Sequence, residues 1–216
     1  SKSHPMTGSS CAAGLSWRRS RYGFAGFCFL SLVASWGLLR LALLLAFGPR
    51  ALSFPALLAA LLGGLQRDIF VALVETVPLL CWMLVVSNRS FGARWHRVTF
   101  LSGCFVFWFA QVFLLFVEFF FFEEFQSRFN TVAVDYLLYP YEVFVNIWQS
   151  YNVTVIVAVC AALSLAWLFA ASKLFAGMWE RPFSFKARLA HLAAVALVAV
   201  LLTPTFNLKG AHVSSD

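Results

Sequence analysis

The sequence is poor in charged residues, and acidic side chains are the scarcest of them. Charged residues make up 12% of the 216-residue chain, about half the share found in an average soluble domain. Nine residues are Asp or Glu, whereas 62% of the chain is hydrophobic. A soluble globule could not cover so much apolar surface with its polar groups. We therefore expect an integral membrane protein of the all-α class.

Motifs of soluble enzymes and of metal sites are also missing. The chain has no HExxH, no P-loop, no glycine-rich dinucleotide turn and no Ser-His-Asp constellation. Its five cysteines form neither a CxxC pair nor a spacing with histidine that suits a metal. We assign no catalytic residue, no disulfide and no metal site, and we expect no cofactor in this chain.

What the sequence does contain is a set of apolar runs that approach the roughly 20 residues needed to cross a bilayer. The five predicted spans are about 22–47, 69–87, 98–122, 153–175 and 189–203. The first is too long for a signal peptide and lacks a clean cleavage site, so we expect an uncleaved helix. A shorter apolar piece, 52–65, contains Pro55 and Gly63-Gly64. It predicts an interfacial or re-entrant helix before the second span.

The distribution of Lys and Arg predicts the orientation. With the N-terminus inside, eleven of the sixteen basic residues face the cytoplasm: Lys2, Arg18, Arg19, Arg21, Arg89, Arg94, Arg97, Lys173, Arg181, Lys186 and Arg188. This bias predicts a cytoplasmic tail at 1–21 and an extracytoplasmic linker that begins at 204–216. The net charge of +7 is divided among short clusters between apolar runs. No long basic stripe is present, so we expect no nucleic-acid partner.

The predicted outer segment 123–152 combines acidic and aromatic side chains. Four of the nine acidic residues lie there, namely Glu123, Glu124, Asp135 and Glu142, together with eight aromatic residues. Aromatic rings of this kind anchor at the level of the lipid headgroups. The segment is too polar to span the membrane and too apolar for a free loop. It predicts one or two short helices in the outer interface, bent at Pro140.

Ionisable residues inside predicted spans are functional candidates by default, because charge is costly there. Arg40 is either a structural residue, snorkelling or ion-paired, or a contact for an anionic lipid headgroup. Glu75 could pair with Arg40 and join two helices. Glu118 is an interface anchor or a headgroup contact, and His191 suits packing better than ligation. Acids at similar depth are too few to favour a proton relay.

The stretch Glu123–Tyr139, EEFQSRFNTVAVDYLLY, resembles the membrane domain of lipoteichoic-acid-synthase-like proteins. In that family an acidic pair precedes an aromatic–RFN–x–x–A–V–D–Y block, which is followed by a glutamate and a Ser-Tyr, here Glu142 and Ser150-Tyr151. A second block, Gly64–Ile69 (GLQRDI), looks like the family's G-x-x-x-D-[LI] at the start of helix two. It departs from the family pattern in the position of its arginine.

The resemblance implies five membrane helices and an extracytoplasmic catalytic domain of the alkaline-phosphatase/sulfatase superfamily. That domain uses a threonine nucleophile and a divalent metal, usually manganese, to move phosphoglycerol from phosphatidylglycerol onto a glycan or glycolipid. It would lie beyond Asp216, so this chain would be the anchor and the lipid-presenting domain, in the bacterial inner membrane. The implied headgroup or domain-docking residues are Arg40, Glu118, Glu123, Glu124, Arg128, Asp135 and Glu142. The alternatives are a non-catalytic regulator of the same superfamily that binds acidic lipid, and a small subunit of a membrane complex or transporter.

Overall fold

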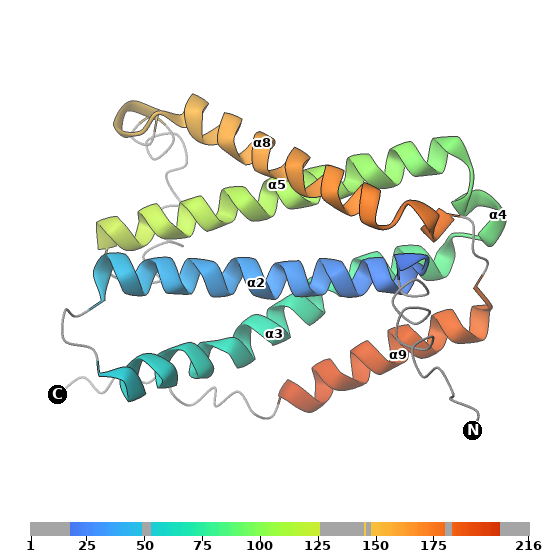
Figure 1. Ribbon diagram of the computed structural model, residues 1–216, viewed down its shortest axis with the longest axis horizontal. Helices are drawn as coiled ribbons and strands as arrows, with labels where there is room; N and C mark the ends of the chain where they lie inside the picture. The colour runs from blue at the N-terminus through green and yellow to red at the C-terminus, as the bar shows by residue number, and fades with distance from the viewer. Residues whose placement is uncertain (1–17, 49–52, 126–144, 146–147, 180–182, 204–216) are drawn as a thin grey trace, which may run out of the picture. The chain divides into compact units, whose positions relative to one another are not determined.

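The computed structural model describes residues 18–48, 53–125, 145, 148–179 and 183–203, and within these ranges every regular element is helical (Figure 1). The α-helices are α2 Arg21–Phe47, α3 Phe54–Val85, α4 Asn88–Phe91, α5 Arg94–Phe125, α8 Val153–Leu174 and α9 Phe185–Leu202. A 3₁₀ helix, η2, covers Ala176–Trp179. The predicted all-α class is confirmed for this part of the chain.

In the described part of the chain, five helices are long and apolar enough to cross a membrane. These candidate spans are Arg21–Phe47, Leu61–Val85, Arg94–Phe125, Val153–Leu174 and Phe185–Leu202. Apolar side chains surround each helix instead of gathering on one face, which is the pattern of a helix that meets lipid. A helix also bonds its own backbone groups, as the bilayer core requires. The prediction of five apolar helices of spanning length, as in a multi-pass membrane protein, is confirmed for the described residues.

The separate short helix predicted over 52–65 is wrong. Helix α3 is continuous from Phe54 to Val85 and passes through Gly63 and Gly64 without a break. Pro55 lies in its first turn, where a missing N–H is tolerated because it would have no helical partner. A helix of 32 residues is about 48 Å long, against about 30 Å of hydrocarbon. The first turns of α3 therefore precede the candidate span, which begins at Leu61, and continue into it as one helix.

Helix α5 likewise runs further than its predicted span. It ends at Phe125, so Glu123 and Glu124 belong to its last turn and not to a separate interfacial helix. Most of the interfacial segment predicted over 123–152, including its bend at Pro140, lies outside the described residues.

The chain divides into two compact units, and each has its own core. Unit 1 comprises Ser1–Val33, Leu62–Gly92 and Phe175–Asp216, and unit 2 comprises Ala34–Leu61 and Ala93–Leu174. In unit 1 the ring centroids of Phe24 and Phe175 lie 5.7 Å apart at 89°. The rings of Phe91 and Trp179 lie 5.0 Å apart. Such pairs keep the buried ends of α2, α4 and η2 together through aromatic contact.

In unit 2, α5 and α8 cross and pack against each other (Figure 1). Trp108 of α5 and Trp167 of α8 contact each other with ring centroids 4.2 Å apart. The buried residues of α8 are all small, namely Cys160, Ser164 and Ala171. Small side chains allow two membrane helices to approach closely, which is how such pairs gain van der Waals contact in lipid.

Candidate functional site

One end of unit 2 brings together the end of α2, the end of α5 and Tyr151, two residues before α8. The ring of Phe47 lies 5.6 Å from that of Phe119 and 5.3 Å from that of Phe122. On the other side of α5, Phe120 lies 4.7 Å from Tyr151. The aromatic run of α5 thus contacts two other chain segments at one level. This arrangement positions the polar groups that follow it.

Glu123, Glu124 and Tyr151 form a cluster at this end, which we name the acidic end of unit 2. Both carboxylates are exposed. Burial raises the pKa of the Tyr151 hydroxyl above its usual 10.0, and the negative charges of Glu123 and Glu124 raise the pKa further. Carboxylates in the last turn of a helix are also opposed by the helix dipole, by about 0.3–1 kcal/mol each. The acidic pair therefore does not serve to stabilise the helix. We treat Glu123 and Glu124 as candidate ligand-binding residues for that reason.

Glu118 lies on α5 five residues before Glu123 and is buried, with 5% of its surface exposed. Gln111, seven residues earlier and on the same face of α5, is buried to a similar degree. The structure thus places Glu118 against protein and not at an open interface. A buried carboxylate within a membrane helix stays a functional candidate, because the bilayer would otherwise select against it.

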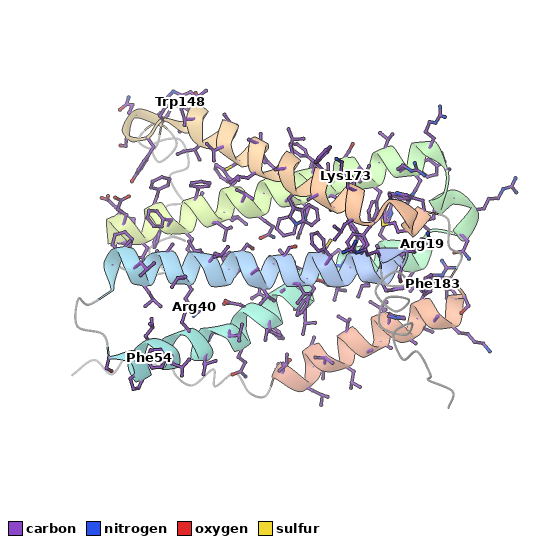
Figure 2. The ribbon with its side chains drawn as sticks, in the orientation of Figure 1. Arg19, Arg40, Phe54, Trp148, Lys173 and Phe183 are labelled. Carbon is purple, nitrogen blue, oxygen red and sulfur yellow. The ribbon has the colours of Figure 1, made fainter. Side chains whose placement is uncertain are left out.

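Two of the remaining predicted site residues, Arg40 and Glu75, lie in described helices. Arg40 is half-buried on the second half of α2, in unit 2 (Figure 2). Glu75 is half-buried on α3 in unit 1, so its pairing with Arg40 stays a prediction. Arg128, Asp135 and Glu142 lie outside the described residues.

A second polar region, at the end of unit 1 where α2 and α9 begin, was not singled out from the sequence. Arg21 and Arg188 are 1% and 8% exposed. The Arg21 guanidinium carbon lies 3.8 Å from the centroid of the Phe91 ring, a cation–π contact. Both arginines were counted only as markers of topology. The signal that could have distinguished them is position, since each lies at the start of an apolar run.

Arg188 joins α9 to the end of α3. Its Nη1 donates hydrogen bonds to the carbonyl oxygens of Leu84, at 3.1 Å, and Val86, at 2.8 Å. The last carbonyls of a helix have no partner within the helix, so a cationic donor both satisfies them and complements the helix dipole. Arg188 therefore acts as a tertiary cap for α3.

Asn88 makes a second tertiary link in unit 1. Its Nδ2 donates to the Phe183 carbonyl at 2.9 Å, and the Phe183 N–H donates to Asn88 Oδ1 at 3.2 Å. Phe183 and Arg19 lie at the same end of this unit (Figure 2). The two bonds connect residues 95 positions apart in sequence. They fix the connection after α3 against the residue that leads into α9.

An aromatic stack lies beside these links. The rings of Tyr22 and His191 are 4.0 Å apart and inclined by 18°. Phe183 meets Tyr22 edge-on at 5.1 Å. His191 Nδ1 lies 2.7 Å from the Ala187 carbonyl oxygen, a distance at which a protonated Nδ1 donates a hydrogen bond. His191 thus has the packing contact predicted for it.

The described residues contain no group of three or more His, Cys, Asp or Glu side chains that could hold a metal ion. Asp68, from the GLQRDI block, is buried in α3. No protein-family model, curated protein or solved structure matches the chain.

Proposed function

We propose that this chain is the membrane anchor and lipid-presenting domain of a bacterial phosphoglycerol transferase. In this proposal the chain lies in the inner membrane with its N-terminus in the cytoplasm. Residues 204–216 lead into an extracytoplasmic catalytic domain. The resemblance of the block around Glu123–Tyr139 to lipoteichoic-acid-synthase-like proteins supports the proposal, and so does the bias of Lys and Arg toward the predicted cytoplasmic side.

The observation that carries the proposal is the convergence at the acidic end of unit 2. Glu123 opens the block that resembles the family, and Tyr151 closes it. Phe120, one turn before Glu123, lies 4.7 Å from Tyr151. The charges of Glu123 and Glu124 act on the Tyr151 hydroxyl. The two flanks of the block therefore meet at one end of the α5–α8 pair, where a lipid headgroup could be held.

The residue types of the block suit a phosphoglycerol headgroup. Arginine can donate two parallel hydrogen bonds to a phosphate, which is the role we assign to Arg128. Carboxylates accept hydrogen bonds from hydroxyl groups, so Glu123, Asp135 and Glu142 would orient the glycerol. Tyr151, whose raised pKa keeps it protonated, can donate as well. In this proposal these residues bind and orient the donor lipid, and the threonine nucleophile and divalent metal belong to the catalytic domain.

The first test is the native polypeptide itself, by intact mass and by its sequence past Asp216. A much larger product with a threonine nucleophile and metal ligands would support the transferase. The same domain without those residues would indicate a regulator that binds acidic lipid. A native chain near 24.1 kDa would refute the transferase and leave a small subunit of a membrane complex.

The second test is turnover of phosphatidylglycerol vesicles by the full-length protein, followed as release of diacylglycerol. Arg128→Gln and Asp135→Asn should raise KM for the lipid on the order of tenfold, because each removes a charge-assisted hydrogen bond. The matched control is Arg89→Gln, which changes an exposed arginine in α4 and should leave KM unchanged. Wild-type KM in both block variants would contradict a lipid-presenting role.

A further inference from the structure

Two buried hydrogen-bond donors in unit 1 are not used by the proposed function. The hydroxyl oxygen of Tyr22 and the Nε of Arg188 are both buried, and neither has a hydrogen-bond partner within the described part of the chain. Arg188 is 8% exposed, and its capping bonds to α3 use Nη1 only. Buried donors in proteins are almost always paired, so two neighbouring exceptions indicate a ligand or ordered water.

The two donors belong to one cluster. The Tyr22 ring stacks on His191 at 4.0 Å. His191 follows Arg188 by three residues and so lies on the same face of α9. The charges of Arg188 and Arg21 both act on the Tyr22 hydroxyl. Two donors and two guanidinium charges therefore belong to one cluster, which favours an anion with at least two acceptor oxygens.

The position of the cluster identifies the class of anion. Tyr22 is the second residue of one candidate span, and Arg188 is the fourth residue of another. Both lie at the depth where a bilayer presents its phosphate groups. The span of α9 is only 6% buried by protein, and the neighbouring Leu189 is 48% exposed. An acyl chain can therefore lie along α9 while its headgroup reaches Arg188.

We propose that the Tyr22 O–H and the Arg188 Nε–H bind phosphoryl oxygens of an anionic phospholipid at the end of unit 1 where α2 and α9 begin. In the topology proposed above this end lies at the cytoplasmic leaflet, and it holds none of the residues assigned to donor-lipid presentation. The site is therefore a structural or regulatory lipid site, separate from donor-lipid presentation. It does not depend on the transferase proposal.

The test measures thermal unfolding of the purified chain in detergent, titrated with short-chain phosphatidylglycerol, short-chain phosphatidylcholine or inorganic phosphate. Tyr22→Phe removes only the hydroxyl and keeps the stack on His191. Ser172→Ala is the control, because it removes a hydroxyl group of unit 2 that takes part in neither proposed lipid site. Lipids that remain bound to each variant after purification are identified by native mass spectrometry.

We expect phosphatidylglycerol to raise the melting temperature of the wild type and of Ser172→Ala saturably, and phosphatidylcholine to act more weakly. Tyr22→Phe should bind phosphatidylglycerol on the order of tenfold more weakly, because a hydrogen bond to a charged acceptor is lost. Without lipid it should be as stable as the wild type, since the lost hydroxyl had no partner. Saturation by inorganic phosphate alone would retain the phosphoryl site and assign it to a soluble ligand. Equal binding by wild type and Tyr22→Phe would overturn the proposal and leave ordered water as the partner.

Discussion

The capping role of Arg188 can be tested by replacing it with methionine, which keeps a long apolar stem and removes every donor. The structure shows two bonds that would be lost, to the carbonyl oxygens of Leu84 and Val86. Hydrogen bonds from a charged donor contribute about 1.5–3 kcal/mol each, so the gross loss is about 3–6 kcal/mol. Removing a buried guanidinium also removes its desolvation penalty, which offsets part of that loss. We expect Arg188→Met to lower the free energy of unfolding by about 2–4 kcal/mol.

The assay is equilibrium unfolding in mixed micelles, followed by tryptophan fluorescence, with hydrogen exchange at the end of α3 as a local readout. Arg188→Lys keeps the charge but not the geometry, so its loss should be smaller and its exchange at Leu84 and Val86 intermediate. Lys186→Met is the matched control, because Lys186 is an exposed cation on the same helix. It should change the free energy by no more than about 0.5 kcal/mol. If Arg188→Met is as stable as Lys186→Met, the capping argument is wrong.

Three further predictions concern α3, the α5–α8 pair and the acidic end of unit 2. A Cβ on Gly63 would meet nothing within 4 Å in the described part of the structure, so Gly63→Ala should stabilise the continuous α3 by up to about 1 kcal/mol; a lower melting temperature would favour a break there. Ser164 is fully buried, so Ser164→Leu should overpack the contact with α5 and lower the free energy of unfolding by about 1–3 kcal/mol. An equal loss of free energy when leucine replaces an exposed residue of α8 would refute that explanation. The pKa of Tyr151 is raised by burial and by two carboxylates, so any stability from its neutral form is present below pH 10.0 and is lost as the pH rises through the folded-state pKa. Absorbance at the tyrosinate band, taken as wild type minus Tyr151→Phe, should titrate above the usual pKa, and changing Glu123 and Glu124 to Gln should lower that midpoint.

Several features of the fold followed from local sequence. The runs that became α2 and α8 were predicted almost to the residue, because a long apolar run has one stable form in a bilayer, a helix. The break at 52–65 was predicted wrongly, because Gly63-Gly64 was treated as a helix terminus. A glycine in a helix interior costs only about 1 kcal/mol relative to alanine. A continuous membrane helix tolerates that cost readily.

The candidate sites were likewise predictable from the sequence only in part. The acidic pair Glu123-Glu124 was visible as charge at the end of an apolar run, and its neighbour Tyr151 was visible as part of a motif. The sequence did not show that the acidic pair and Tyr151 lie close together, because that depends on how α5 packs against α8. The donors of Tyr22 and Arg188 were missed for the same reason, since they are 166 residues apart in the sequence.

Composition and pattern alone thus determined the solvent of this protein, its helical class and its number of spans, because those properties depend on the free energy of each segment in lipid. The tertiary structure decided which polar groups are buried and which ones meet. Arg188 bonds to the end of α3, and its charge acts on the Tyr22 hydroxyl, only through the packing of helices far apart in the sequence. Side-chain contacts of that kind depend on the rotation and register of whole helices, and apolar length does not encode either one.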